Sequence, residues 1–277
     1  MLKTRVITAV LLLAGLLPAL FYLPPLGWAW LTSAALAIGG WEWGGFMKLK
    51  AAARVVLGAV FFAICAALIL SFPSAMGGEG WSESAALLLG QWFYAPSAVF
   101  WFLVLPLWLR HRWPLPGVLG GLVIGSVVLL PTWLALVQLR QLGAWTLVCT
   151  MAIVWMADIA AYFAGRAFGK RKMAPSISPG KTWAGAVGAV IGVQVYGYLA
   201  ASWLPQALQP NLIAFGVTLA VLTVLSIVGD LFESLLKRQA GIKDSSNVLP
   251  GHGGVLDRID SLTSTLPIVT LLWLASR

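Results

Sequence analysis

The sequence is a series of long apolar runs, and this feature limits most strongly what the chain can fold into. A helix that crosses a lipid bilayer needs about 20 consecutive, mostly apolar residues. Nine runs have or approach that length, at residues 6–23, 26–46, 54–73, 92–109, 117–138, 143–164, 183–204, 211–232 and 261–276. We therefore predict an all-α fold, a polytopic integral membrane helix bundle with about nine transmembrane helices.

The composition agrees with a membrane protein. Hydrophobic residues make up 60% of the chain and charged residues 10%, whereas about 25% of a typical soluble domain is charged. The first apolar run is longer than the core of a secretory signal, so we interpret it as the first span. We expect one membrane domain, 1–277, with N-terminal helices over about 1–140. A catalytic portion over about 143–277 would carry loops at 165–182 and 233–260.

The basic residues indicate how the chain is oriented. Sixteen of the eighteen Lys and Arg residues lie at the N-terminus or in the even-numbered connections, and the exceptions are Arg140 and Arg277. Short cytoplasmic loops retain positive charge. We therefore predict a cytoplasmic N-terminus and a C-terminus on the opposite side. Topology then explains much of the net charge of +9, so that nucleic acid is not an expected partner.

Several tryptophans lie near the predicted span ends. Indole rings are enriched at the two membrane interfaces, where they form aromatic belts. We expect that position for Trp28, Trp30, Trp41, Trp43, Trp108 and Trp113.

Acidic residues crowd into one stretch between the last two predicted spans. Five of the nine lie between residues 230 and 260, namely Asp230, Glu233, Asp244, Asp257 and Asp260. At helical spacing Asp230 shares a face with Ser234, and Glu233 shares one with Lys237. Carboxylates that gather at a membrane boundary need a compensating cation, and Mg²⁺ binds one or two carboxylates together with phosphate oxygens. We predict Asp230 and Asp257 as metal ligands, with Asp260 as a third ligand or as a partner of the ligands.

Glycines and cations surround these carboxylates. The stretch Gly251-His252-Gly253-Gly254 can bring backbone N–H groups close to phosphate oxygens. The cationic groups nearby are Lys237, Arg238, Lys243 and Arg258. Metal ligands, an anion cradle and cations are the parts that phosphoryl transfer requires. His252 is either a neighbour of phosphate or a residue of the turn.

The spacing of these residues resembles the signature of the phosphatidate cytidylyltransferases, also called CDP-diglyceride synthases. That signature reads S-x-x-K-R, four residues, K-D, a short variable stretch, P-x-H-G-G and D-R-x-D. Its fixed positions are filled here by Ser234, Lys237, Arg238, Lys243, Asp244, Pro250, His252, Gly253, Gly254, Asp257, Arg258 and Asp260.

A second segment upstream is similar to the same family. It contains Asp158 and the run Ser178-Pro179-Gly180-Lys181-Thr182-Trp183. Family members usually have Lys at the position of Gly180 and Glu at that of Ala184. The resemblance covers roughly the last 125 residues.

The resemblance implies the conversion of CTP and phosphatidic acid to CDP-diacylglycerol and pyrophosphate in a bacterial plasma membrane. It also implies Mg²⁺ and a second, monovalent ion such as K⁺. Our mechanistic hypothesis assigns catalysis to Asp230, Asp257, Asp260, Lys237 and Arg258. Substrate binding is assigned to Asp158, Ser178, Lys181, Thr182, Ser234, Arg238, Lys243, Asp244, His252, Gly253 and Gly254.

Three alternatives bear on this interpretation. Asp158 could instead form a structural hydrogen bond or ion pair with Lys181 or Arg166. The same charges could serve an anionic-lipid transporter or flippase that performs no chemistry. A CDP-alcohol phosphotransferase also uses clustered aspartates, but its D-G-x-x-A-R motif does not occur in this sequence. A homodimer is compatible with the main interpretation.

Overall fold

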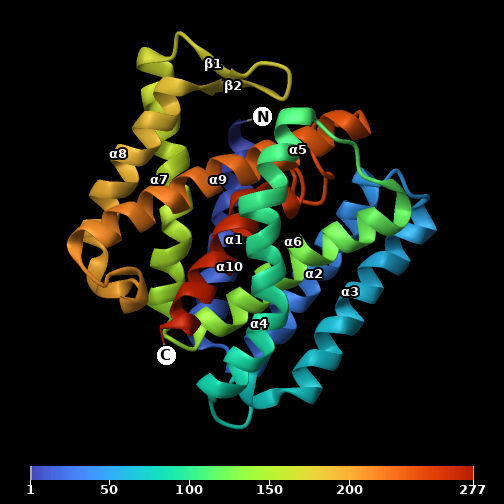
Figure 1. The fold of residues 1–277 in the computed structure, drawn as a ribbon. Coiled ribbons are helices and arrows are strands. Elements are labelled where there is room, and N and C mark those ends of the chain that lie inside the picture. Colours follow the sequence, from blue (N-terminus) through green and yellow to red (C-terminus); the bar gives the residue numbers. More distant parts are fainter. Residues whose placement is uncertain (1, 277) are drawn as a thin grey trace.

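The computed structural model describes residues 2–276, and for residues 2–7 and 9 it describes the backbone alone. Lys3 and Arg5, which contribute to the predicted orientation, thus lie outside the described side chains. Helices dominate the fold (Figure 1). They are α1 (Leu2–Tyr22), α2 (Pro25–Phe46), α3 (Ala51–Ser71), α4 (Glu83–Val99), α5 (Leu105–His111), α6 (Gly117–Arg140), α7 (Ala144–Phe168), α8 (Trp183–Leu199), α9 (Leu212–Ala240) and α10 (Leu256–Ala275). A π-helical segment, Phe100–Val104, joins α4 to α5.

Helices α6 and α10 occupy the centre of the bundle. Helix α10 packs against α4, α6 and α9, and α6 also contacts α2. Polar side chains of α10 fasten it to α9: Ser261 Oγ donates to the carbonyl of Ser226 at 2.9 Å, and Ser264 Oγ donates to that of Leu225 at 2.8 Å. Such hydroxyl bonds and small residues hold helices together where lipid removes the hydrophobic driving force.

A glycine sets the close approach of α9 and α10. A Cβ atom at Gly229 would lie 3.0 Å from the carbonyl oxygen of Asp260 and 2.5 Å from Ser264 Oγ. No side chain therefore fits at this point. The contact places Asp230, the next residue of α9, beside the first turns of α10.

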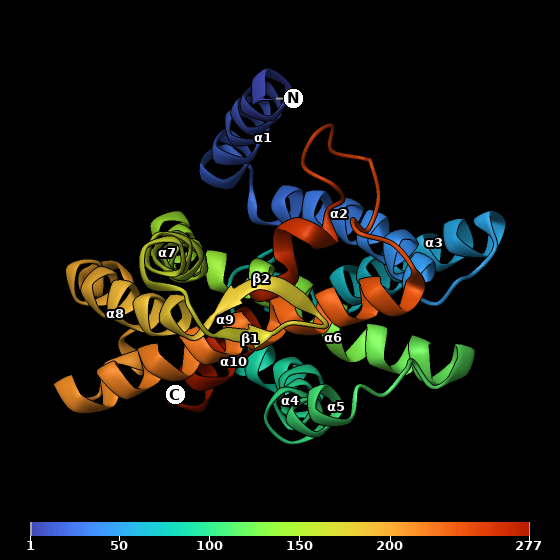
Figure 2. The ribbon, with the colours of Figure 1, turned by 90° about the horizontal axis from the view of Figure 1, so that it is seen from above.

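Helices α7 and α8 form a tightly packed pair at one side of the bundle (Figures 1 and 2). A Cβ at Gly185 would lie 2.9 Å from the carbonyl oxygen of Ala161, and one at Gly188 would lie 2.2 Å from Ala164 Cβ. The backbones can approach this closely because small residues line the contact. Large apolar side chains such as Phe163 and Ile191 point outward and are exposed, as expected for a surface in lipid.

A short hairpin joins α7 to α8. Strands β1 (Lys172–Ala174) and β2 (Ser178–Thr182) pair antiparallel, with Lys172 opposite Thr182. Thr182 Oγ1 accepts the N–H of Gly185 at 3.1 Å and thereby caps α8. The hairpin contacts the end of α9, where Arg238 Nε donates to the carbonyl of Ile177 at 3.4 Å. The sequence had indicated a loop here.

The fold class is confirmed as all-α, but the number of spans is shown only in part. Five helical segments of the described chain are long and apolar enough to cross a membrane: α3, the continuous α4–α5 rod over Glu83–His111, α6, α7 and α9. Helix α8 and the Val10–Tyr22 part of α1 are apolar but shorter. Helices α2 and α10 belong neither to the five candidate spans nor to the shorter apolar helices. They carry buried polar residues such as Glu42 and Ser264.

Several helices extend beyond the apolar runs that were predicted as spans. Helix α4 begins at Glu83 rather than near residue 92, because Ser82 Oγ accepts the N–H of Ala85 and caps it. Helix α9 continues beyond residue 232 to Ala240 and ends at Gly241, whose positive φ of 79° suits a glycine cap. Helix α10 begins at Leu256 rather than at residue 261.

The aromatic-belt prediction was wrong for three tryptophans. Trp28, Trp43 and Trp108 are buried, with exposed fractions of 2%, 3% and 5%. The indole N–H of Trp28 donates to the carbonyl of Leu136 at 3.0 Å, and that of Trp43 donates to Gly121 at 2.9 Å. These rings therefore pack inside the bundle, where a backbone acceptor satisfies the N–H of Trp28 and of Trp43.

The connections rich in Lys and Arg gather at one end of the bundle. Gln239 Nε2, at the end of α9, donates to the carbonyls of Arg112 and Trp113 at 3.1 and 3.0 Å. The hairpin lies at the same end, and the start of α1 and the end of α10 lie at opposite ends of the bundle (Figure 1). Figure 2 shows α1 standing apart from the other helices, beside the segment that links α9 to α10.

Candidate active site

A salt bridge joins the hairpin to α9. Lys181 Nζ, in β2, lies 2.8 Å from Asp230 Oδ2, and it also donates to the carbonyl of Ile227 at 3.0 Å. Both charged side chains are about three-quarters buried, with exposed fractions of 21% and 27%. Ser234 Oγ donates to Asp230 Oδ1 at 3.1 Å, which confirms the predicted pair on one face of the helix.

A second lysine holds two carboxylates together. Lys237 Nζ lies 3.1 Å from Glu233 Oε1 within α9 and 2.6 Å from Asp257 Oδ1 in α10. The first contact confirms the predicted spacing of four residues. All three side chains are nearly buried, so the ammonium group balances charges that solvent does not screen.

Asp257 accepts hydrogen bonds at both carboxylate oxygens. Its Oδ2 atom accepts the N–H of Ser245, the hydroxyl of Ser245 and the N–H of Gly254, each at 2.8 Å. Asp257 lies in the first turn of α10, ahead of the predicted span. Burial opposes its charged form, but the bonds from Gly254, Lys237 and Ser245 outweigh burial and hold its pKa below the ordinary value.

Acidic side chains of three helices lie close enough for their charges to interact. The charge of Asp260 repels those of Asp230 and Asp158, and Glu233 is repelled by both Asp260 and Asp257. We call this group the carboxylate band: Asp158 of α7, Asp230 and Glu233 of α9, and Asp257 and Asp260 of α10. Among the described residues, the ammonium groups that contact the band are those of Lys181 and Lys237.

The three predicted metal ligands do not converge on one point. No three acidic, histidine or cysteine side chains of the described residues are placed to hold a metal ion together. Asp257 faces Lys237, whereas Asp230 faces Lys181 and Ser234. Asp230 and Asp260, on facing helices, nevertheless offer the hard oxygen donors that Mg²⁺ prefers. A site made of two carboxylates and substrate phosphate oxygens needs no third protein ligand.

The glycine-rich stretch forms a tight turn before α10. The N–H of Leu249 donates to the carbonyl of Gly253 and that of His252 donates to Leu249, both at 2.8 Å. Gly251 and Gly253 have φ values of 75° and 82°, a region that favours glycine. The N–H of Gly254 is bound by Asp257, so it is not free to receive a phosphate as predicted.

Glu42 is a member of this site that the sequence interpretation missed. It lies in α2 and is completely buried, and it accepts hydrogen bonds from Ser245, Ser246, Val255 and Leu256. Its isolated acidic position within an apolar run was the one available signal, because a carboxylate at membrane depth requires partners.

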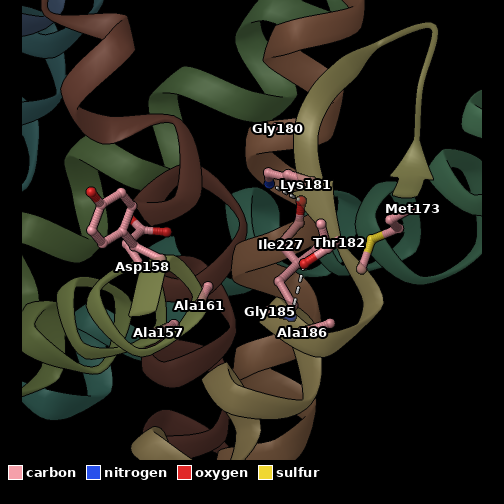
Figure 3. Close-up of a pocket in the computed structure, with 11 residues that line it drawn as sticks. Ala157, Asp158, Ala161, Met173, Gly180, Lys181, Thr182, Gly185, Ala186 and Ile227 are labelled. Atoms are coloured by element: carbon pink, nitrogen blue, oxygen red, sulfur yellow. Dashed lines mark hydrogen bonds between the residues drawn. The ribbon is translucent and has the colours of Figure 1, made fainter. Parts of the chain in front are cut away.

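A pocket of about 200 Å³ opens beside the Lys181 salt bridge. Figure 3 shows Asp158 on one side of the pocket and Lys181 with Thr182 on the other. Small and apolar residues such as Ala161 and Ile227 line the rest. The pocket therefore combines an apolar wall with one cation and one carboxylate.

The alternative ion pair of Asp158 does not form. Lys181 pairs with Asp230 instead. The guanidinium of Arg166 donates to the hydroxyl of Tyr162 at 3.3 Å. Asp158 is exposed into the pocket, so its carboxylate is open to a ligand there.

The remaining predicted residues lie around the band. Ser178 is half-buried in β2, and Lys243, Asp244 and Arg258 are exposed. Arg238 is exposed at the end of α9, where its guanidinium also reaches the carbonyl of Ile242 at 3.4 Å. These cations surround the carboxylate band but form no described salt bridge with it.

The chain is similar along its whole length to proteins of one family. The family model described as "Cytidylyltransferase family" matches residues 3–275. A phosphatidate cytidylyltransferase of Pseudomonas aeruginosa is 41% identical over 282 residues, which cover 99% of this chain and 98% of that protein. One of Haemophilus influenzae is 35% identical over 298 residues and 99% of both chains. One of Thermotoga maritima is 39% identical over 132 residues, which cover 47% of this chain and 49% of that protein.

Proposed function

The chain belongs to the family of phosphatidate cytidylyltransferases, the enzymes that make CDP-diacylglycerol, and from this premise we propose that the carboxylate band and the adjoining pocket form its active site. The reaction joins CTP and phosphatidate. An oxygen of the lipid phosphate attacks the α-phosphorus of CTP, the bond from that phosphorus to the bridging oxygen breaks, and its electron pair leaves with pyrophosphate.

The observation that carries this proposal is the Lys181–Asp230 salt bridge at the edge of the pocket. It supplies a partly buried cation, which can bind a phosphate in place of the carboxylate. Asp158 and Thr182 line the same pocket. An apolar wall on a surface that we assign to lipid suits a substrate whose phosphate must enter from the membrane.

No nucleophilic side chain is required, because the lipid phosphate is already an anion. The chain's own residues bind and neutralise the reacting phosphates, which is how most phosphoryl transfer is accelerated. We assign this role to Lys181, Lys237 and Arg258, with Ser178, Ser234, Arg238, Lys243, Asp244, His252 and Gly253 at the surrounding positions. Gly254 keeps a structural role, since Asp257 binds its N–H.

The carboxylate band fits Mg²⁺ by its chemistry. Five carboxyl groups face two ammonium groups, and burial together with repulsion between neighbouring carboxylates opposes their full ionisation. A bound divalent cation would relieve this repulsion and favour the charged forms. Asp230 and Asp260 would hold the ion, and Asp257 could join them only by giving up its contact with Lys237. When bound, Mg²⁺ would withdraw charge from the phosphate oxygens of CTP. The monovalent ion implied by the family resemblance belongs to the same proposal.

The proposed location is a bacterial plasma membrane, with the active site on the cytoplasmic side. The gathering of basic connections at one end of the bundle supports this orientation. The start of α1 and the end of α10 lie at opposite ends of the bundle (Figure 1), which suits an odd number of spans, and we retain nine as the proposal. A homodimer is compatible with this arrangement.

The direct test gives the purified protein, in phospholipid nanodiscs, labelled CTP and phosphatidate with and without Mg²⁺. We expect one pyrophosphate for each CDP-diacylglycerol, and product formation that stops when the metal is chelated. Absence of both products under every metal condition would overturn the proposal.

The transporter alternative is tested by Asp257→Asn in the same assay. A transporter that performs no chemistry would form no product with either protein and would keep its lipid transport in the variant. The proposed enzyme forms product as wild type and loses it in the variant, while protein level and membrane insertion stay normal. The matched control is Glu79→Gln, because Glu79 is an exposed carboxylate in the connection before α4.

A further inference from the structure

Glu42 binds a segment that lies more than 200 positions away in the sequence. Its Oε1 atom accepts the hydroxyl of Ser246 at 2.6 Å and the N–H of Val255 at 2.9 Å. Its Oε2 atom accepts the N–H of Leu256 at 2.7 Å and lies 3.2 Å from Ser245 Oγ. Both oxygens are thus fully engaged, inside a helix that is otherwise apolar around them.

Two of these contacts cap α10 from a different helix. Val255 is the residue before the helix, and its apolar side chain makes no capping hydrogen bond. Glu42 accepts the two backbone N–H groups at this point instead. A carboxylate is well placed there, because the N-terminus of a helix has free N–H donors and a partial positive charge.

The same carboxylate is linked to Asp257 through one hydroxyl. Ser245 Oγ lies 2.8 Å from Asp257 Oδ2 and 3.2 Å from Glu42 Oε2. A serine hydroxyl has a single proton to donate, so the two acidic groups share it. Movement of Glu42 would therefore alter both the start of α10 and a hydrogen bond of Asp257.

The turn is tightly packed at Gly254, against the side chains of Glu42 and Ser245. A Cβ atom at this position would lie 2.1 Å from both Glu42 Oε1 and Ser245 Oγ. The turn, the serine and the two carboxylates are consequently packed as one unit. Its geometry depends on Glu42, because this residue contacts both ends of the connecting segment.

The geometry points to Glu42 as a positioning residue that sets the place of Asp257 in the active site from α2. The inference rests on the proposed function, because that function places Asp257 in the active site. It gives α2, in the N-terminal half of the chain, a part in a site that is otherwise assigned to the C-terminal half. Glu42 touches no proposed substrate position, and it acts through Ser245, Val255 and Leu256.

The test replaces Glu42 by glutamine, which has the same shape but presents an amide NH₂ where one carboxylate oxygen accepted two contacts. We expect kcat to fall on the order of 100-fold, since a misplacement of about 1 Å can cost that much, while KM for phosphatidate changes less than about twofold. Glu79→Gln is the matched control. An unchanged kcat would overturn the inference, and so would a loss that appears entirely in KM.

A double-mutant cycle with Ser245→Ala tests the link through the hydroxyl. If Glu42 acts through Ser245, the double variant loses little beyond the worse single variant, because both changes break the same connection. Losses that simply multiply would show that Glu42 and Ser245 act independently and would contradict the proposed path.

Backbone hydrogen exchange supplies a readout that needs no activity. In Glu42→Gln the N–H groups of Val255 and Leu256 should exchange faster, while peptides from the centre of α6 keep their protection. Unchanged protection would overturn the inference even in an active enzyme. Conversely, a wild-type protein that makes no product would end the proposed function and leave this structural test intact.

Ser246→Ala covers the case in which Glu42→Gln fails to fold. This variant removes one contact to Glu42 and leaves every partner of Asp257 in place. We expect a fall in kcat of several-fold, with faster exchange confined to the segment before α10. Full activity together with normal exchange in Ser246→Ala would count against the inference.

Discussion

Lys181 Nζ lies 2.8 Å from Asp230 Oδ2, and this contact joins the hairpin between α7 and α8 to the carboxylate band. Because the ammonium group also lines the pocket, it can exchange its carboxylate partner for a substrate phosphate. The pair balances charge within the protein, and in the proposed mechanism its cation also binds a substrate phosphate.

Lys181→Ala should reduce kcat/KM on the order of 100-fold or more, because removing one preorganised charge-stabilising donor from an active site typically costs that much. Steady-state assays over a range of phosphatidate concentrations measure the effect. Lys172→Ala is the control, since Lys172 is exposed in the neighbouring strand. Equal losses in the two variants would contradict a specific role for Lys181.

Lys237→Met should destabilise the fold, because the change leaves Glu233 and Asp257 buried without their shared cation. Breaking a buried charge pair in this way typically costs about 3–5 kcal/mol. Thermal unfolding in detergent should show a clear fall in Tm. Lys243→Met, at an exposed position, should leave Tm unchanged, and a similar Tm for all three proteins would contradict the prediction.

Gly254→Ala should be far more damaging than Gly15→Ala. The added methyl group would collide with Glu42 and Ser245 at position 254, whereas a Cβ at Gly15, in α1, meets no atom within 4 Å. We expect lower Tm and little product from the first variant, and wild-type values from the second. Comparable behaviour of the two alanine variants would show that the turn adapts.

Contacts within single helices were predictable from the sequence. The spacing of four residues correctly paired Asp230 with Ser234 and Glu233 with Lys237, because a helix fixes which side chains share a face. The same rule could not assign the partner of Lys181. That choice depends on how the hairpin folds over α9, which no local pattern encodes.

Glu42 shows the other limit of sequence interpretation. Its neighbours in the chain are apolar, and its partners lie in a segment that begins at Ser245. The tertiary packing of α2 against the start of α10 creates this contact. In the predicted phosphate cradle, the N–H of Gly254 is bound by Asp257, three residues further along the chain.

The most direct test of the central claim compares Asp230→Asn with the wild-type protein in the CDP-diacylglycerol assay, at matched protein level and membrane insertion. Asp230 contacts Lys181 and Ser234 and faces Asp260 across the α9–α10 contact. We predict that wild-type protein forms product in the presence of Mg²⁺ and that the variant loses at least about 100-fold in kcat. Wild-type turnover by Asp230→Asn would contradict the assignment of the carboxylate band as the active site.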